Sequence, residues 1–392
     1  MSDNTPWQSP AGPSASPPPS PYATSGATPP PPAGPPGWTP PPKPGLIPLR
    51  PLTLGTLLGA AFQVLRRNPR PTFGFALLLT GLIFVVTLLA VGFVSFFALS
   101  RIASATGADE DAVAAGSVAT IILSGLVPVV LSIVVTAVLQ AIIVLEVARG
   151  TVGEKLRLPG LWRAAKGRIG AVIGWALLLT GAAVAALAIL SVVIGLSIAF
   201  GGTAGLVIGI ILGVLAAGAA IAVAFWLGTR LCLVPSALML ERLPLRAAIT
   251  RSWSLTTGYF WKTLGIQLLV AVIIQTVAGI ISAPLQVLLG FSGFLINPNG
   301  ETDGLIAGAV VLYLLTIILS VVFGAIAAVI QSATTALIYI DLRMRKEGLD
   351  LELNRFVEAR QAGNGSVPDP YLQRVATHGA EPHAPSSPSP WS

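Results

Sequence analysis

Charged residues divide the chain into long apolar stretches. Five stretches contain no charged residue over 30, 34, 61, 38 and 37 positions; they are residues 71–100, 112–145, 169–229, 263–300 and 304–340. A membrane-spanning helix needs about 20 apolar residues, so four of the stretches predict one spanning helix each. The 61-residue stretch has room for two, and its central segment Phe200–Gly205 (FGGTAG) predicts the turn between them.

This pattern predicts an all-α fold, a polytopic membrane helical bundle of six transmembrane helices with short interfacial helices and disordered, proline-rich termini. We expect spans at about residues 72–99, 118–145, 170–199, 206–229, 264–290 and 305–338, within a membrane domain of residues 46–355. Residues 1–45 hold 17 of the 33 prolines and predict a disordered cytoplasmic tail, because such a segment buries too little apolar area to fold. Residues 356–392 predict a second disordered cytoplasmic tail. For the proline-rich tail we favour a solvated arm over a partner-binding segment.

Charge placement supports six spans and orients them. If the N-terminus is inside, 22 of the 23 basic residues lie in inner segments, and Arg101 is the single base among acidic outer loops. Cytoplasmic loops of membrane proteins carry such an excess of lysine and arginine. The composition, with 18 arginines to 5 lysines, is typical of a GC-rich bacterial genome. We therefore expect a multi-pass protein of a bacterial plasma membrane with both termini in the cytoplasm.

Composition excludes a soluble globular protein. Of all residues, 54% are hydrophobic and 10% are charged, whereas a soluble protein has about 25% charged residues. In so apolar a chain, the net charge of +7 indicates attraction to anionic membrane lipids and no nucleic-acid partner.

Three proline-containing segments precede the first, third and fifth spans. Ile47–Arg50, Leu158–Arg163 and Leu243–Arg246 each combine Pro, Leu and Arg. Each predicts a short helix whose apolar side lies in the headgroup layer. This suggests three units, each an interfacial helix followed by two spans. The alternative is that any basic, proline-containing inner loop looks alike.

The sequence offers few groups for catalysis or metal binding. Both histidines, His378 and His383, lie in the C-terminal tail, and Cys232 is the single cysteine. The middles of the predicted spans carry no charged residue, although intramembrane charges mark ion and proton pathways. We therefore predict a protein that is not an enzyme, without catalytic residues, cofactor or metal.

Glycine and glutamine side chains are candidates for contacts between spans. Glycines on the third and fourth spans predict that these helices pack closely, with homo-oligomerisation as the alternative and the oligomeric state left open; they are Gly201, Gly205, Gly209, Gly213, Gly170 and Gly174. The deepest polar side chains are glutamines, which either tie helices together or line a substrate path; the candidates are Gln140, Gln267, Gln275 and Gln331.

Two charged residues end spans on the inner side. Glu146 follows the second span and Arg230 follows the fourth. We expect a structural ion pair of Arg230 with Glu146 or Glu241 rather than a ligand site.

After the sixth span, charges are spaced for a helix. Asp341 and Arg345, and likewise Arg343 and Glu347, stand in the i,i+4 relation. This predicts salt bridges on a helical extension that anchors the bundle at the inner surface. The alternative is a docking site for a cytoplasmic partner.

Two segments resemble one bacterial membrane family. Glu241–Gly265 (ERLPLRAAITRSWSLTTGYFWKTLG) looks like the signature stretch of the membrane domain of glycerophosphoryl diester phosphodiesterases and their stand-alone relatives. Asp341–Leu351 (DLRMRKEGLDL) is similar to the segment after the last helix in those relatives. The resemblance covers about residues 46–355 and implies a helical membrane domain, attached in some relatives to a soluble phosphodiesterase barrel. Such a barrel needs about 250 residues, so no catalytic residue carries over to this chain.

The favoured functional hypothesis is a non-enzymatic accessory domain, a membrane scaffold or partner-binding protein with an unidentified protein partner. The alternative is a passive or lipid-handling transporter. A water-accessible cavity around Gln140, Gln267 and Gln331 would favour the transporter.

Overall fold

A computed structural model describes residues 45–104, 110–295, 303–364 and 366–372. The described residues form helices and no strand. In chain order the helices are α1 (Leu54–Arg67), α2 (Phe75–Thr87), α3 (Phe93–Ser104), α4 (Glu110–Ser124), α5 (Leu126–Thr151), α6 (Leu158–Ala165), α7 (Ile169–Leu231), α8 (Val234–Leu240), α9 (Leu245–Thr256), α10 (Phe260–Leu295), α11 (Asp303–Glu347) and α12 (Leu349–Gln361), with π-helical turns at Arg70–Gly74 and Leu88–Gly92.

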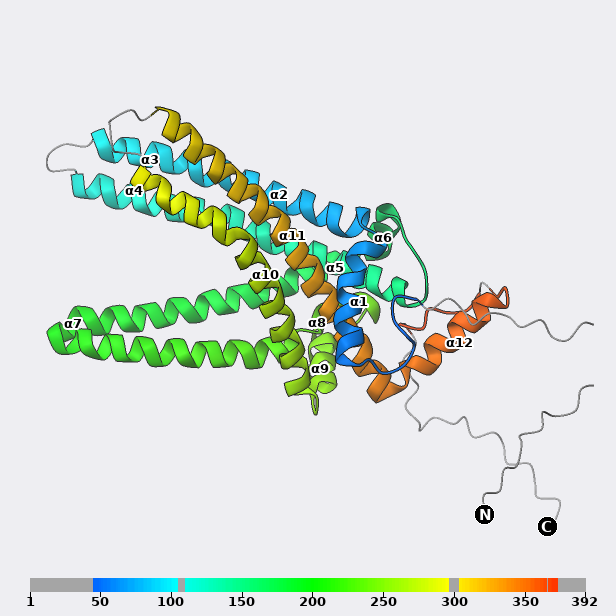
Figure 1. Cartoon of the computed structure of the whole chain (residues 1–392). Coiled ribbons are helices and arrows are strands. Elements are labelled where there is room, and N and C mark those ends of the chain that lie inside the picture. Colours follow the sequence, from blue (N-terminus) through cyan, green and yellow to red (C-terminus); the bar gives the residue numbers. More distant parts are fainter. Residues whose placement is uncertain (1–44, 105–109, 296–302, 365, 373–392) are drawn as a thin grey trace, which may run out of the picture. The chain divides into compact units, whose positions relative to one another are not determined.

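Six helical segments are long and apolar enough to cross a membrane, which confirms the predicted number of spans. They are Arg70–Ser104, Val113–Thr151, Ile169–Gly202, Ala204–Leu240, Phe260–Phe291 and Val310–Glu347. α7 contributes two of them because its backbone leaves the helical region at Gly202, with φ 55° and ψ −140°. A positive φ costs glycine little because it has no Cβ atom, so the predicted turn forms where the glycines stand. Figure 1 shows α7 running out and returning beside itself.

Short helices precede the odd-numbered spans, as the proline-containing segments predict. α1, α6 and α9 come directly before the first, third and fifth spans. One apolar side of α1 is buried in the protein, since α1 packs against α11 and Leu57, Ala61 and Val64 are buried. Leu54 and Phe62 of the same helix are exposed, and their position in the headgroup layer stays a prediction.

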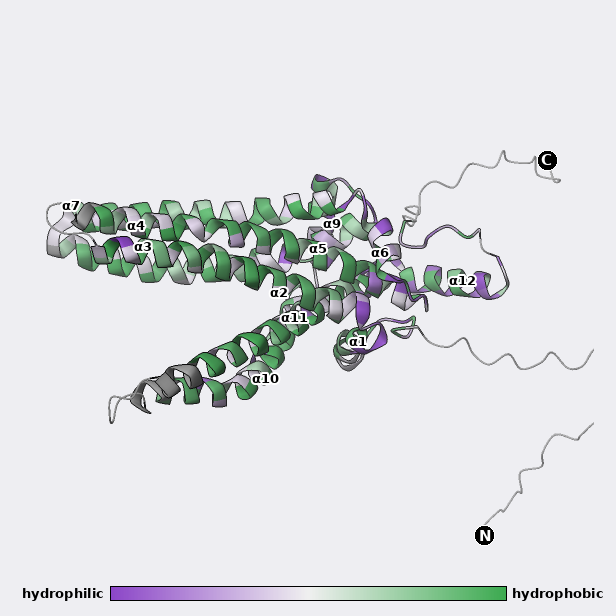
Figure 2. Ribbon diagram, turned by 90° about the horizontal axis from the view of Figure 1, so that it is seen from above, coloured by the Kyte–Doolittle hydropathy of each residue, from purple (hydrophilic) through white to green (hydrophobic). Residues whose placement is uncertain are grey.

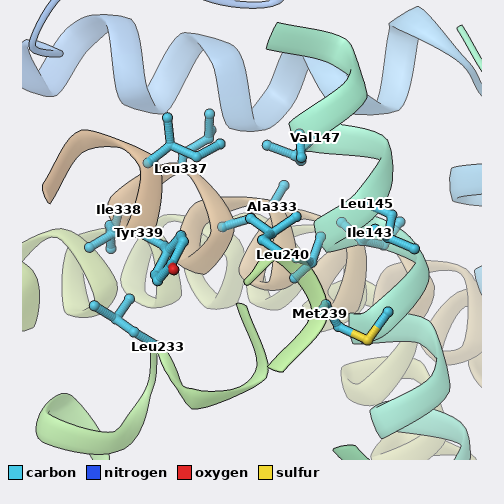
Figure 3. Close-up of a cluster of buried hydrophobic side chains, with 14 of the residues drawn as sticks. Ile143, Leu145, Val147, Leu233, Met239, Leu240, Ala333, Leu337, Ile338 and Tyr339 are labelled. Carbon is cyan, nitrogen blue, oxygen red and sulfur yellow. The ribbon is translucent and has the colours of Figure 1, made fainter. Parts of the chain in front are cut away.

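The hydrophobic core lies where α5, α8 and α11 converge. Every residue of α5 from Ala141 to Ala148 is buried, as is every residue of α8. Figure 3 shows part of this cluster, with side chains of α5 and α8 gathered beside α11; the labelled ones include Ile143, Leu145, Val147, Met239, Leu240, Leu337, Ile338 and Tyr339. This cluster lies at the ends of the spans that carry the basic segments, and we call it the inner base, after the side on which the charge pattern predicts it to lie. Figure 2 shows the apolar spans in green, with polar residues gathered around α1, α6 and α12.

The structure corrects the predicted start of the C-terminal tail at residue 356. α12 continues to Gln361, and Phe356 is buried together with Leu349 and Leu353. These three side chains lie on one face of the helix. Because most other residues of α12 are polar, the average composition of the segment does not indicate this short apolar face. Residues 1–44 and 373–392, where disorder is predicted, lie outside the described residues.

Candidate functional site

Asp341 on α11 is a buried junction between three parts of the chain. Its side chain is 2% exposed and accepts hydrogen bonds from the backbone N–H of Leu52 (2.7 Å), from Lys262 Nζ (2.7 Å) and from Arg345 Nε (3.0 Å). Arg345 also donates to the carbonyl of Leu52 at 2.7 Å. One carboxylate therefore joins α11, the start of α10 and the segment that leads into α1.

A second group of charges surrounds Glu241, at the end of α8. Arg251 of α9 donates to Glu241 at 2.9 Å and to Glu347 at 2.7 Å. Arg343, whose side chain is 1% exposed, donates to Glu347 at 3.0 Å, and the Tyr339 hydroxyl donates to Glu241. Burial of Arg251 opposes its charge, but Glu347 and Glu241 outweigh this effect and raise the pKa of Arg251. We call these groups, together with those around Asp341, the charge network.

The charge network is suited to holding helices together. Breaking a buried ion pair leaves an uncompensated charge and costs about 3–5 kcal/mol, so the network fixes the elements that supply its members. Within the described residues, no group of three or more His, Cys, Asp and Glu side chains could hold a metal ion. Both i,i+4 pairs on α11 are present, Asp341 with Arg345 and Arg343 with Glu347.

The segment after α12 returns to the inner base. Asp369 accepts from Arg149 at 2.5 Å, and the Tyr371 hydroxyl lies 2.5 Å from the hydroxyl of Thr151, at the end of α5. The carbonyl of Tyr371 also accepts from Arg343 at 3.3 Å. Tyr371 is buried, and burial raises the pKa of its phenol. We call residues 366–372 the C-terminal strap.

The N-terminal side of the membrane domain is fixed at the same end of α5. The N–H of Leu46 donates to the carbonyl of Gly150 at 2.8 Å, and Arg67 donates to this carbonyl too. A Cβ atom on Gly45 would lie 2.1 Å from the Thr151 carbonyl oxygen, so the close approach requires glycine there.

The predicted pairing of Glu146 with Arg230 is wrong. Glu146 is buried and accepts from Asn68 at 3.1 Å, and its second carboxylate oxygen has no hydrogen-bond partner among the described residues. Arg67 lies nearby; burial lowers the pKa of its guanidinium, and the charge of Glu146 partly offsets this. Glu146 therefore belongs to the junction of α1 with α5.

Arg230 has a different environment. Its Nη1 donates to the Thr257 hydroxyl at 3.1 Å, and its guanidinium lies over the rings of Trp253 (5.1 Å) and Phe260 (5.5 Å). Glu241, the other expected partner, is occupied by Arg251. α8 carries Glu241 away from the end of α7, which explains why the pair does not form.

The glycines of the fourth span pack inside the α7 hairpin. A Cβ atom on Gly205 would lie 2.1 Å from the carbonyl oxygen of Ser197, one on Gly209 would lie 2.9 Å from Ile198, and one on Gly213 would lie 3.5 Å from Ile194. The predicted partners Gly170 and Gly174, and also Gly201, have open space instead. In an antiparallel hairpin, residues equally far from the turn face each other, so Gly170 and Gly174 lie at the opposite end from this contact.

Two of the four candidate glutamines share a cleft. Gln267 of α10 and Gln331 of α11 line a cavity of about 210 Å³, whose other walls are α7 and α10. Gln140 is half-buried and does not line the cavity, and Gln275 is exposed on α10. The four glutamines therefore do not form one polar path.

Sequence reasoning missed the contacts of the site between residues that are far apart in the sequence. Glu241 and Tyr339 are 98 residues apart, and Thr151 and Tyr371 are 220 apart. The one indication in the sequence was that the Glu241–Gly265 stretch contains a glutamate and arginines. Their spacing along the chain does not identify the residues with which they pair. Nothing in the proline-containing segment around Tyr371 indicated that this tyrosine would be buried against α5.

Comparison with known protein families gives one match. Residues 206–362 match the family described as the membrane domain of glycerophosphoryl diester phosphodiesterase, which confirms the predicted resemblance for this part of the chain. The matched residues include the second half of α7, the cleft and the side chains of the charge network, and they end before the C-terminal strap. No curated protein matches the chain, and no solved structure matches it.

Proposed function

We propose that this chain is a non-enzymatic membrane scaffold that binds a protein partner at its inner face. The observation that carries the proposal is the charge network, which joins α8, α9, α10, α11 and the segment before α1. This arrangement is a fixed platform next to the basic segments, and it uses its charged groups in pairing rather than in catalysis. A rigid platform lowers the entropy cost of partner binding.

α12 is the element of the platform on which we expect a partner to dock. Its buried side packs on the protein through Leu349, Leu353 and Phe356, while Leu351 on the other side is 61% exposed. The resemblance to a membrane domain that accompanies a soluble domain in some relatives supports a partner of soluble type.

The test is purification of the tagged protein from its native membranes in mild detergent, with mass spectrometry of what accompanies it. We expect one protein in near-stoichiometric amount. Leu351→Glu should reduce its recovery at least about tenfold, since tenfold corresponds to about 1.4 kcal/mol and burying a charge in an apolar contact costs more. Leu372→Glu, an equal change at another exposed leucine, is the control. A preparation without any protein partner would contradict the proposal.

The orientation that this proposal requires has its own test. In a Cys232→Ser background, single cysteines replace Ser366 on the C-terminal strap or Ser104 at the end of α3, both exposed. With a membrane-impermeant maleimide on intact cells, we expect S104C to react and S366C to react only after the cells are opened. The reverse pattern would place the basic face outside.

A second candidate function is passive lipid handling, favoured by the cleft that contains Gln267 and Gln331. It predicts that purified protein in vesicles speeds the exchange of a fluorescent phospholipid between leaflets. Changing both glutamines to leucine should slow that exchange, while Gln275→Leu should not. No exchange above that of protein-free vesicles would remove this candidate.

A further inference from the structure

Arg230, in the last turn of α7, has no carboxylate partner among the described residues. It donates one hydrogen bond, to the Thr257 hydroxyl, and its Nε is buried without a hydrogen-bond partner. Arg343 and Arg251, by contrast, both pair with Glu347. The remaining Nη donors of Arg230 are thus available to an anion that the protein itself does not supply.

A second cation adjoins the same turn. Lys346 Nζ donates to the carbonyls of Ser254 and Thr257, each at 2.7 Å, and it is close enough to Arg230 for the two positive charges to repel each other. Since Thr257 contacts both side chains, the two cations flank one residue. Glu347, next to Lys346 in the chain, is engaged by Arg251 and cannot neutralise the pair fully.

Aromatic rings place this pair at the headgroup level. Trp253 and Phe260 lie under the guanidinium of Arg230, and the ring of Tyr259 lies 5.7 Å from Lys346 Nζ. Trp261, beside Phe260, is 80% exposed. Tryptophan and tyrosine are enriched where the hydrocarbon layer meets the headgroups, so the cations stand at the depth of lipid phosphates.

The cleft begins beside Arg230 and runs along the spans. Its α7 wall includes Phe225 and Gly228, and its α10 wall includes Leu264 and Leu268. The lining is predominantly apolar, and a side chain added at Gly228 would meet no atom within 4 Å at its Cβ. With a volume of about 210 Å³, the cleft accommodates part of one acyl chain.

We propose that Arg230 and Lys346, both held by Thr257, bind the phosphodiester of one phospholipid from the leaflet at the inner base, and that one of its acyl chains lies in the cleft between α7 and α10. The planar guanidinium binds phosphate oxygens through parallel hydrogen bonds, and the ammonium adds a second charge. This inference is independent of the scaffold function, because a bound lipid needs no protein partner.

The experiment is native mass spectrometry of the full chain in detergent, titrated with phosphatidylglycerol. We expect one lipid to bind ahead of the others. Arg230→Gln should weaken this first binding about tenfold, since it removes the charge-assisted hydrogen bonds to the phosphate. Arg246→Gln, the same change at an exposed arginine on α9, is the control and should leave binding within about twofold.

The acyl chain is tested separately by Gly228→Leu, which fills the cleft and leaves Arg230 in place. We expect this variant to weaken lipid binding as much as Arg230→Gln, and we expect inorganic phosphate not to compete. Competition by phosphate, together with normal lipid binding by Gly228→Leu, would show a simple anion site and overturn the proposal. Equal binding by Arg230→Gln and the unchanged protein would overturn it as well. Thermal unfolding of each variant checks that it is folded.

Discussion

The inner base and the α7 hairpin are both rich in aliphatic residues, yet they pack in opposite ways. In the inner base, α5 is buried on all sides from Ala141 to Ala148. In the hairpin, side chains such as Leu187, Val192 and Leu215 are exposed, and among the described residues from 177 to 228 only Gly205 and Gly209 are buried. Lipid solvates an exposed leucine well, so apolar side chains alone do not draw helices together in a membrane.

This difference indicates which contacts hold the tertiary structure of the chain together. The buried cluster forms where polar side chains and backbone groups of the connecting segments can pair with one another, as around Asp341. The hairpin has close packing only where small residues let two backbones approach. Substitutions should therefore have large effects in the inner base and small effects along most of the hairpin.

The largest effect is expected for Asp341→Ala. It removes the acceptor shared by Leu52, Lys262 and Arg345 and leaves two charges without their partner, at a cost of about 3–5 kcal/mol. Thermal unfolding in detergent should show a strongly lowered Tm. Glu358→Gln, at an exposed position of α12, is the control; equal Tm values for the two variants would mean that the network does not stabilise the fold.

A smaller effect is expected for Gly205→Val in the hairpin. The added Cβ would lie 2.1 Å from the Ser197 carbonyl oxygen, and relief of such overpacking costs about 1–3 kcal/mol. Gly181→Val adds the same side chain in open space in the same hairpin. We expect a lower Tm for G205V alone, and a similar Tm for both variants would place the contact between the two halves elsewhere.

The C-terminal strap should contribute about 1 kcal/mol through the hydroxyl of Tyr371. Tyr371→Phe removes the contact with Thr151 and should lower the Tm slightly at neutral pH. Tyr313→Phe, at an exposed tyrosine of α11, is the control.

The same variant gives a pH test. Burial raises the pKa of Tyr371 in the folded state, so its stabilising effect is fully present below the unfolded value of about 10 and is lost as the pH rises above it. The Tm of the unchanged protein should therefore approach that of Y371F at alkaline pH. A gap in Tm that widens with pH would contradict this assignment.

The smallest effect is expected for Gln275→Leu. Its amide is exposed on α10 and has no hydrogen-bond partner among the described residues, so the change should alter stability by no more than about 0.5 kcal/mol. A strong loss of stability in unfolding measurements would show that Gln275 contacts another copy of the chain or a partner helix.

The spans and their turn could be predicted from sequence because each depends on neighbouring residues. A run of uncharged residues is enough for a span, and Gly202 stands within the segment that predicted the turn. The pairs on α11 follow from the fixed geometry of a helix, in which residues four apart are neighbours.

The rest of the site depends on how separate helices meet. Asp341 and Leu52 are 289 residues apart, and nothing in local spacing brings them together. The Glu146–Arg230 prediction failed for this reason: both end spans on one side, but the sequence does not say toward which neighbour each side chain turns. The hairpin contact was more accessible, since a turn at Gly202 brings the glycines that follow it close to the residues that precede it, among them Ser197 and Ile198.

The segment before α1 and the segment after α12 are both held by adjacent residues at the end of α5. Leu46 is tied to Gly150, and Tyr371 is tied to Thr151, the last residue of α5. A ligand that recognises both flanks would therefore meet two binding epitopes tethered at a common origin. Once the ligand has bound the first epitope, the second epitope is present at a high effective concentration. Two weak interactions would then combine into strong overall binding without any new contact.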